Sequence, residues 1–264
     1  MSYGSGSLPL AVAHRGGAGL GPENTLAAFG LSTALGIRYL ETDVRVTRDG
    51  QMLCFHDASL DRVTAASGPV GLCSLAELHG LRVDGREPLC TLEQALAAFP
   101  DARFMVDLKD RGALGPLVAL LQNPSYAARV CVAGAWDGWL ARLRAEVAGA
   151  HTALGWRSLT ALIALSRAGA RAPGWVRTAG FAHVPIRLGS VPILCHRLVD
   201  RAHDLGIRVV VWTVDEAGEM HRLLDAGVDG VITDRPDVLR EVLIARGQWQ
   251  PLRSVTPRPT PSLP

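Results

Sequence analysis

The chain has 264 residues, of which 48% are hydrophobic and 20% are charged, and its formal net charge is +2. A chain of this length and composition can bury a large core without disulfide bonds, and intrinsic disorder is excluded over most of it. The nearly balanced charge and the lack of a basic run argue against a nucleic-acid-binding protein. No stretch approaches the roughly 18 consecutive apolar residues of a membrane span.

Eight apolar segments have the length and composition of buried strands, and helical patterns separate most of them. The predicted strands are residues 10–13, 37–44, 103–108, 129–132, 151–154, 181–184, 207–214 and 228–234. Three of them follow an amphipathic helix and one glycine (Gly36, Gly206 or Gly227), a residue suited to the left-handed turn that ends a helix. Their continuously apolar sequence is typical of parallel strands that helices cover.

This order predicts an α/β fold, a (β/α)8 TIM barrel over residues 10–250, because eight such units in about 250 residues is the size of that barrel. A doubly wound open sheet is the alternative with the same periodicity. Residues 58–91 lack a clear strand and contain several glycines, so we expect a short cap-like insertion after the second strand. We expect a flexible N-terminus over residues 1–9 and a disordered proline-rich tail over residues 251–264.

The cysteines bear on the cellular compartment. Five of them form no CxxC pair, and an odd number cannot all be bridged. We therefore expect reduced, mostly buried cysteines in a cytoplasmic protein. The first nine residues also lack the basic segment of a signal peptide.

Acidic residues at predicted strand ends suggest a metal site, since catalytic side chains of such barrels come from these ends. Glu41 and Asp43 are two residues apart on one strand, so both carboxylates lie on the same face. Two like charges this close are unfavourable without a cation between them. Asp107 on the next strand adds a third oxygen donor for a hard divalent cation such as Mg²⁺ or Ca²⁺. Ordinary salt bridges at the loops are the alternative for each of these acids.

Basic residues at neighbouring strand ends suggest an anionic substrate. Arg15 follows the first strand, and its planar guanidinium suits two-point recognition of a phosphate. His14 and His56 are of the type that exchanges protons near neutral pH. Lys109 is the only lysine among 27 basic residues, which favours a required ammonium contact to phosphate or beside the metal. Trp212, at a later strand end, is placed to pack on a substrate, with a core position as the alternative.

Five short motifs occur in a fixed order within 44 residues: His14-Arg15-Gly16, Pro22-Glu23-Asn24-Thr25, Glu41-x-Asp43, Thr47-Arg48-Asp49-Gly50 and His56-Asp57. This series resembles the signature of the glycerophosphodiester phosphodiesterase family. Residues 211–214 and 227–236 are similar to its last two strands. The resemblance covers roughly residues 10–110 and 205–240, and residues 111–200 carry no motif.

The resemblance implies a role for each matching residue. His14 and His56 are then the general acid/base pair, Glu41 and Asp43 are metal ligands, and Arg15 holds the phosphoryl oxygens. The family's third ligand is normally a glutamate two residues before a lysine; here Asp107 takes that place, with Lys109 in the lysine position. The shorter side chain leaves the metal (Mg²⁺, Ca²⁺ or Mn²⁺) open.

The expected activity is hydrolysis of glycerophosphodiesters to sn-glycerol 3-phosphate and an alcohol, an activity of lipid and glycerol metabolism. The attacking hydroxyl is either water or a hydroxyl of the substrate. We expect a small-molecule substrate, no nucleic acid and no membrane span, and the sequence does not fix the oligomeric state. One rival is a phospholipase D-like barrel acting on lysophospholipid or sphingolipid head groups, which needs a wider apolar mouth than residues 58–91 offer. The other is a non-catalytic barrel that only binds phosphodiesters.

Overall fold

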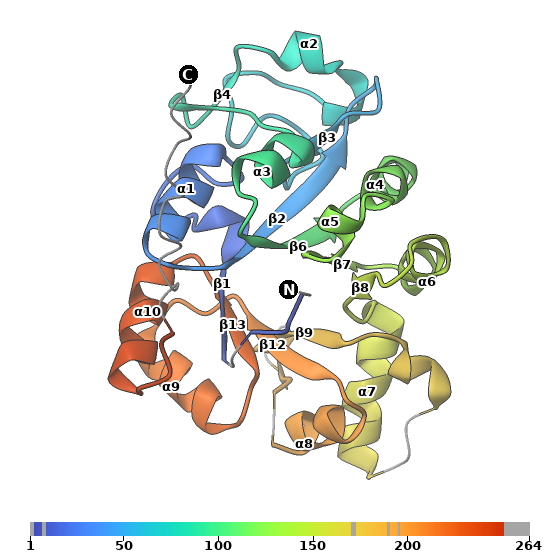
Figure 1. Cartoon of the computed structure of the whole chain (residues 1–264), viewed down its shortest axis with the longest axis vertical. Helices are drawn as coiled ribbons and strands as arrows, with labels where there is room; N and C mark the ends of the chain where they lie inside the picture. Colours follow the sequence, from blue (N-terminus) through green and yellow to red (C-terminus); the bar gives the residue numbers. More distant parts are fainter. Residues whose placement is uncertain (1–2, 7–8, 170–172, 189–190, 195, 251–264) are drawn as a thin grey trace, which may run out of the picture.

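The computed structural model describes residues 3–6, 9–169, 173–188, 191–194 and 196–250. Within this part of the chain, eight parallel strands pair in the order β8-β7-β6-β2-β1-β13-β12-β9. A parallel bridge between Ala153 and Phe181 joins the two ends of the row, so the sheet closes into a barrel (Figure 1). The strands are β1 (Leu10–Ala13), β2 (Tyr39–Val46), β6 (Arg103–Leu108), β7 (Val130–Gly134), β8 (His151–Thr152), β9 (Phe181–Pro185), β12 (Arg208–Trp212) and β13 (Gly230–Thr233). The (β/α)8 prediction is confirmed, and the open-sheet alternative is wrong.

Helices surround the barrel in Figure 1. Outside the insertion described below, the α-helices of the described residues are α1 (Leu26–Ala34), α3 (Leu92–Ala98), α4 (Leu114–Leu121), α5 (Pro124–Ala127), α6 (Asp137–Glu146), α7 (Trp156–Ala168), α8 (His196–Asp204), α9 (Ala217–Asp225) and α10 (Pro236–Ala245). Short 3₁₀ turns are η1 (His14–Gly16), η3 (Arg111–Ala113) and η4 (Gly174–Thr178). Local sequence fixes where several helices begin: the Thr25 hydroxyl accepts from the Ala28 amide at the start of α1, and Thr91 forms a capping box with Gln94 at α3.

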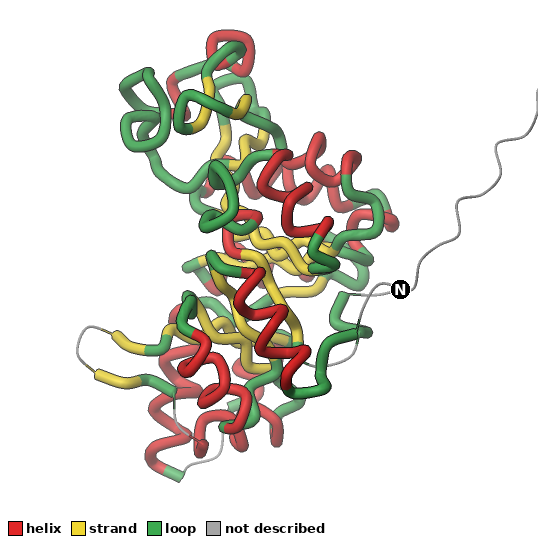
Figure 2. The backbone as a smooth tube through the Cα atoms, turned by 90° about the vertical axis from the view of Figure 1, so that its left-hand side faces the viewer, coloured by secondary structure: helices red, strands yellow, loops and turns green. Residues whose placement is uncertain are grey.

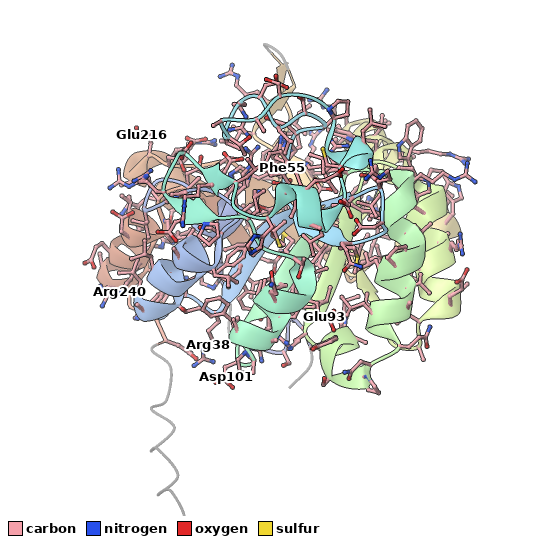
Figure 3. All side chains as sticks on the ribbon, turned by 90° about the horizontal axis from the view of Figure 1, so that it is seen from above. Arg38, Phe55, Glu93, Asp101, Glu216 and Arg240 are labelled. Carbon is pink, nitrogen blue, oxygen red and sulfur yellow. The ribbon has the colours of Figure 1, made fainter. Side chains whose placement is uncertain are left out.

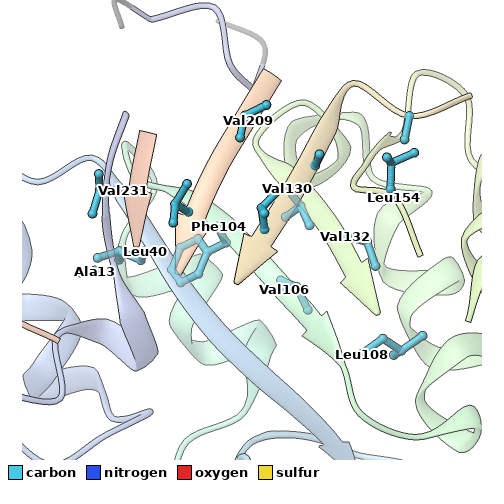
Figure 4. Packing of buried hydrophobic residues seen from close by; sticks show 14 of the residues in the cluster. Ala13, Leu40, Phe104, Val106, Leu108, Val130, Val132, Leu154, Val209 and Val231 are labelled. Carbon is cyan, nitrogen blue, oxygen red and sulfur yellow. The ribbon is translucent and has the colours of Figure 1, made fainter. Parts of the chain in front are cut away.

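Alternation along the strands divides the apolar side chains into two layers. One set fills the barrel interior and includes Leu10, Val12, Met105 and Ile232. The alternate residues point outward and pack against the helices, as Figure 4 shows for Leu40, Phe104, Val106, Val209 and Val231, among others. The barrel is therefore a packed core, and a ligand must bind at one of its ends.

The chain leaves the barrel after β2 to form the expected insertion. Strand β3 (Met52–Cys54) pairs antiparallel with β2, and η2 (Val70–Leu72), α2 (Leu75–Leu78), β4 (Arg82–Val83) and β5 (Glu87–Pro88) follow. The insertion has its own small core around Phe55, Leu60 and Leu78. We expected no clear strand here; the hairpin β4–β5 forms because its two-residue strands need only a tight turn at Asp84 and Gly85, both with positive φ.

The insertion and the hairpin of β10 (Arg187–Leu188) and β11 (Val191–Pro192) project from the same side of the barrel in Figure 2. Figure 3 shows the polarity of the strands: Arg38 and Asp101, which precede β2 and β6, lie near one edge, and Glu216, which follows β12, lies near the opposite edge. The mouth of the barrel is thus at the carboxyl ends of the strands, where catalytic side chains of this fold lie.

Tyr3, in the N-terminal segment, is buried among the interior residues, and its ring packs edge-on against Tyr39 and Phe181. The aromatic ring gains more from filling the bottom of the barrel than from solvent exposure. Residues 1–2 and 7–8 lie outside the described residues, so the flexibility of residues 1–9 stays a prediction. The tail over residues 251–264 lies outside the described residues.

The described cysteines, Cys54, Cys73, Cys90 and Cys131, are free thiols, and all but Cys73 are buried. Cys195 lies outside the described residues. Among the helices of the described ranges, none is long and apolar enough to cross a membrane.

Candidate active site

All eight side chains selected from the sequence line one cavity of about 390 Å³ at the mouth of the barrel. They are His14, Arg15, Glu41, Asp43, His56, Asp107, Lys109 and Trp212. The strand register explains the carboxylate cluster: Glu41 and Asp43 share the inward face of β2 with the interior residue Tyr39, and Asp107 pairs in register with Asp43. The closed barrel therefore brings together residues that the sequence spreads over almost 200 positions.

Glu41 and Asp43 are buried carboxylates, 6% and 1% exposed. Burial, and next the charge of Asp43, raise the pKa of the Glu41 carboxyl. Burial also opposes ionisation of Asp43, but the Lys109 ammonium outweighs it and lowers the pKa of that carboxyl. The pair thus carries one charge readily and a second only with a further cation nearby.

Lys109 lies between two of the three carboxylates. Its Nζ is 2.9 Å from Asp43 Oδ1 and 2.6 Å from Asp107 Oδ2. Burial works against its charge, yet Asp107 and Asp43 together raise the pKa of Lys109. The only lysine of the chain therefore offsets part of the negative charge of Asp43 and Asp107.

The donor set of Glu41, Asp43 and Asp107 consists of oxygens, which suits a hard divalent cation. In the described ranges, however, no three His, Cys, Asp or Glu side chains are already gathered as a site that could hold a metal ion. Lys109 holds Asp107 and Asp43 instead. The residues fit a metal by their chemistry, and a bound ion would have to share Asp43 and Asp107 with this ammonium.

His14 is oriented by a carboxylate from the far end of the chain. Its Nδ1 lies 2.7 Å from Asp234 Oδ1, just beyond β13, and its Nε2 lies 4.0 Å from Glu41 Oε2. Burial disfavours the protonated ring, but the Asp234 hydrogen bond and the Glu41 charge outweigh it and raise the pKa of His14. The ring therefore presents Nε2 toward the acidic cluster.

His56 is held in the same way by its neighbour in sequence. Its Nδ1 lies 2.6 Å from Asp57 Oδ1, and Asp57 also accepts from Arg62. Burial tends to protonate Asp57, but the hydrogen bonds from Arg62 and His56 prevail and lower its pKa to about 2. Both histidines thus use Nδ1 for a structural hydrogen bond to a carboxylate and keep Nε2 for other contacts.

Arg15 reaches the cavity from an unusual backbone position, with φ of 49°. This turn points its backbone N–H at Glu41 Oε2, 2.7 Å away, and places its guanidinium between Glu23 and Asp43. Glu23 also binds Arg62, so the Arg15 side chain is part of a network that extends to His56 through Asp57. The network fixes the guanidinium beside the carboxylates.

Asn24 belongs to the Pro22–Thr25 motif, and its role appears only in the folded structure. Asn24 is 2% exposed, and its side-chain amide donates to Asp43 Oδ2 at 3.0 Å while its carbonyl accepts from Thr42 Oγ1 at 2.7 Å. Asp234 and Asp57 likewise belong to motifs, and each orients one of the two histidines. The partners of Asn24 and Asp234 are distant in the sequence, so the motifs mark these two residues only as candidates, whereas Asp57 adjoins its partner His56.

A second group of cavity residues carries no motif. Trp136, Trp139 and Trp156 line the cavity from the segment in which the sequence showed no signal, and His183 lines it from β9. Trp212, 36% exposed at the end of β12, lines the cavity as expected rather than lying in the barrel core. Its peptide bond to Thr213 is cis.

Comparison with known proteins agrees with this geometry. The model of the glycerophosphoryl diester phosphodiesterase family matches residues 14–238. The chain belongs to this family. Glycerophosphodiester phosphodiesterases are phosphoric diester hydrolases, and this chain is an enzyme of that class.

Relatives span nearly the whole chain. The protein named probable glycerophosphodiester phosphodiesterase 2 of Mycobacterium tuberculosis is 37% identical over 244 residues, which cover 91% of this chain and 92% of the relative. A glycerophosphodiester phosphodiesterase of Caldanaerobacter subterraneus is 28% identical, with coverage of 87% and 96%. A solved structure, that of an Oleispira antarctica phosphodiesterase in complex with the product sn-glycerol-3-phosphate, is similar to this chain with a TM-score of 0.74 and 22% sequence identity. The similarity covers 90% of this chain and 97% of the other. That likeness shows the barrel fold.

Proposed function

We propose that this glycerophosphodiester phosphodiesterase hydrolyses glycerophosphodiesters to sn-glycerol 3-phosphate and an alcohol, with His14 and His56 as the general acid/base pair. The observation that carries this proposal is the shared arrangement of the two rings in one cavity. Each Nδ1 lies within 2.7 Å of an aspartate oxygen, and each ring lines the cavity beside the acidic cluster. A carboxylate on Nδ1 holds an imidazole in one tautomer and orientation.

The residues divide the reaction between them. One histidine takes the proton of the attacking hydroxyl, and the other gives a proton to the leaving alkoxide. Arg15 and Lys109 bring positive charge to the phosphoryl oxygens, where negative charge grows in the transition state. Asn24 keeps Asp43 in place through its amide hydrogen bond.

We further propose that Glu41, Asp43 and Asp107 hold a divalent cation. The burial of Glu41 and Asp43 beside each other supports this, because the second charge of the pair requires compensation. When bound, such an ion polarises a phosphoryl oxygen as a Lewis acid. The enzyme would then depend on Mg²⁺, Mn²⁺ or Ca²⁺.

The test is a hydrolysis panel of glycerophosphocholine, glycerophosphoethanolamine and glycerophosphoglycerol with each metal, with sn-glycerol 3-phosphate as the measured product. His14→Ala and His56→Ala should each lower kcat by about 100-fold or more, the usual contribution of positioned acid/base catalysis. Their melting temperatures should stay close to that of the wild type. Near-native turnover in either variant would remove that histidine from the mechanism.

A further inference from the structure

The lining of the cavity changes character from one side to the other. Its charged residues belong to β1, β2, β3 and β6 and the turns that follow them. The residues from β7, β8 and the helices after them are uncharged: they include Ala133, Leu154 and Leu159 and three tryptophans. We call Trp136, Trp139 and Trp156 the tryptophan platform. The phosphodiester chemistry described above uses none of these three side chains.

Two side chains of the platform are exposed large apolar residues. Trp136 is 62% exposed and Trp156 is 43% exposed, although both line a cavity. The rings of Trp136 and Trp139 lie 6.1 Å apart at 48°. Contiguous exposed apolar surface on the rim of a pocket marks a ligand-binding surface.

Hydrogen bonds fix the two loops that carry the platform. The Trp156 amide donates to Ala135 O at 3.0 Å, and the Asp137 carboxylate accepts from the amides of Arg157 at 3.0 Å and Ser158 at 3.3 Å. Gly155 permits this close approach, because a Cβ at that position would lie 2.5 Å from Asp137 Oδ2. The platform is therefore preformed, so a ligand loses little free energy in ordering it.

The charges around the platform decide what it can hold. The carboxylates that line the cavity, within the described ranges, are Glu41, Asp43 and Asp107, all on the opposite, charged side. Asp137 is engaged in capping α7, and the Arg157 guanidinium stacks on Trp175 at 4.9 Å. Two leucines, two alanines and a glycine complete the surface. Such a surface offers apolar contact and no counter-charge for a cationic group.

We propose that the tryptophan platform is a subsite for an uncharged alkyl or acyl chain carried by one ester arm of the phosphodiester. This inference rests on the proposed function for the reaction, and it adds an amphiphilic class of substrate. The apolar mouth that residues 58–91 lack lies instead on residues 133–159. The charged side of the cavity receives the phosphodiester, and the chain extends across the platform toward solvent.

Chain length tests the proposal directly. Hydrolysis is measured for glycerophospho-n-alkanols from methanol to octanol, each below its micelle concentration. In the wild type, kcat/KM should rise about fourfold for each methylene that the platform buries, and then level off. The double variant Trp136→Ala/Trp156→Ala should reduce the octyl-to-methyl ratio of kcat/KM to near one. A wild-type ratio near one, or a ratio that this variant leaves intact, overturns the proposal.

Two further variants separate the role of the platform from damage to the fold. Trp136→Phe/Trp156→Phe keeps apolar rings and should retain most of the chain-length dependence. Trp175→Ala removes a tryptophan that is 40% exposed but does not line the cavity, so it should keep the full dependence. Loss of the dependence in the Trp175 variant would contradict the assignment.

A charge comparison separates an apolar subsite from a cation cage. Glycerophosphocholine is compared with its neutral isostere, the 3,3-dimethylbutyl diester. The neutral diester should have the equal or higher kcat/KM, whereas a strong preference for choline would overturn the proposal, since aromatic faces also bind quaternary ammonium groups.

A binding measurement tests the tryptophan platform separately from the proposed catalytic reaction. The affinity of n-alkyl phosphonates is measured by calorimetry for the wild type and Trp136→Ala/Trp156→Ala. If affinity rises with chain length only in the wild type, the subsite stands even if no diester is hydrolysed, in which case the proposed function fails alone. Equal dependence in both proteins, or none in either, overturns the subsite.

Discussion

His14 Nδ1 and Asp234 Oδ1 lie 2.7 Å apart although 220 positions separate the two residues. β1 and β13 are neighbours in the closed barrel, with Ala13 and Thr233 in register, so the residues that follow them meet at the mouth. Asp215 fixes the turn after β13 by accepting from Thr233 Oγ1 and from the Asp234 amide. Asp234 is thus a positioning residue for the proposed catalytic ring.

Asp234→Asn should lower kcat by about tenfold or more with a small change in KM, because an amide no longer selects the tautomer that leaves Nε2 toward the cluster. The loss should stay below the roughly 100-fold or greater effect of removing the ring. In a His14→Ala background the same substitution should cost nothing further. Asp237→Asn, in an exposed pair with Arg235, is the control. Additive losses in the double variant would show that Asp234 acts independently of His14.

Arg15→Lys should lower kcat/KM by about tenfold or more although it conserves charge. Lysine loses the planar fork that holds two oxygens, and it cannot keep the contacts to Glu23 and Asp43 together. Arg48→Lys, whose ion pair with Glu77 is exposed, provides the matched control. An unchanged kcat/KM for the Arg15 variant would mean that the guanidinium acts only as a distant charge.

Asp107 determines the metal preference in our proposal. Chelation should abolish turnover, and Mg²⁺, Mn²⁺ and Ca²⁺ should restore it to different degrees, since Ca²⁺ accepts more protein oxygens than Mg²⁺. Asp107→Asn should weaken metal affinity strongly, whereas Asp107→Glu should remain active with an altered order of metals. Titration of activity with each metal in the three proteins measures this. If Asp107→Asn uses metal like the wild type, the site depends on Glu41 and Asp43 alone.

His183 should make the fold sensitive to acid. Burial lowers its pKa to about 4, from an ordinary value of 6.5, so the ring is neutral in the folded protein at neutral pH. Between these two values the unfolded chain binds more protons than the folded chain, so the free energy of unfolding falls as pH drops from about 6.5 toward 4. His183→Gln should reduce this fall, as measured by urea unfolding across the window. Parallel pH profiles for the two proteins would contradict the prediction.

The strand pattern and the ordered motifs predicted much of the protein. Period-two alternation placed Glu41 and Asp43 on one face of β2, and short-range residue order placed His14, Arg15 and Lys109 at strand ends. These are local properties of the backbone, so the sequence alone determines them. The barrel, the enzyme family and the eight motif-based candidates that line the cavity follow from such local patterns.

Only the tertiary structure decided which distant groups meet. Closure of the barrel pairs Asp234 with His14, and the register of β2 with β6 sets Asp107 beside Asp43, where Lys109 binds both. The sequence does not predict the tryptophan platform, because single tryptophans occur both in protein cores and at surfaces. Its position depends on Gly155 and Asp137 holding two loops together, and that contact exists only once the chain has folded.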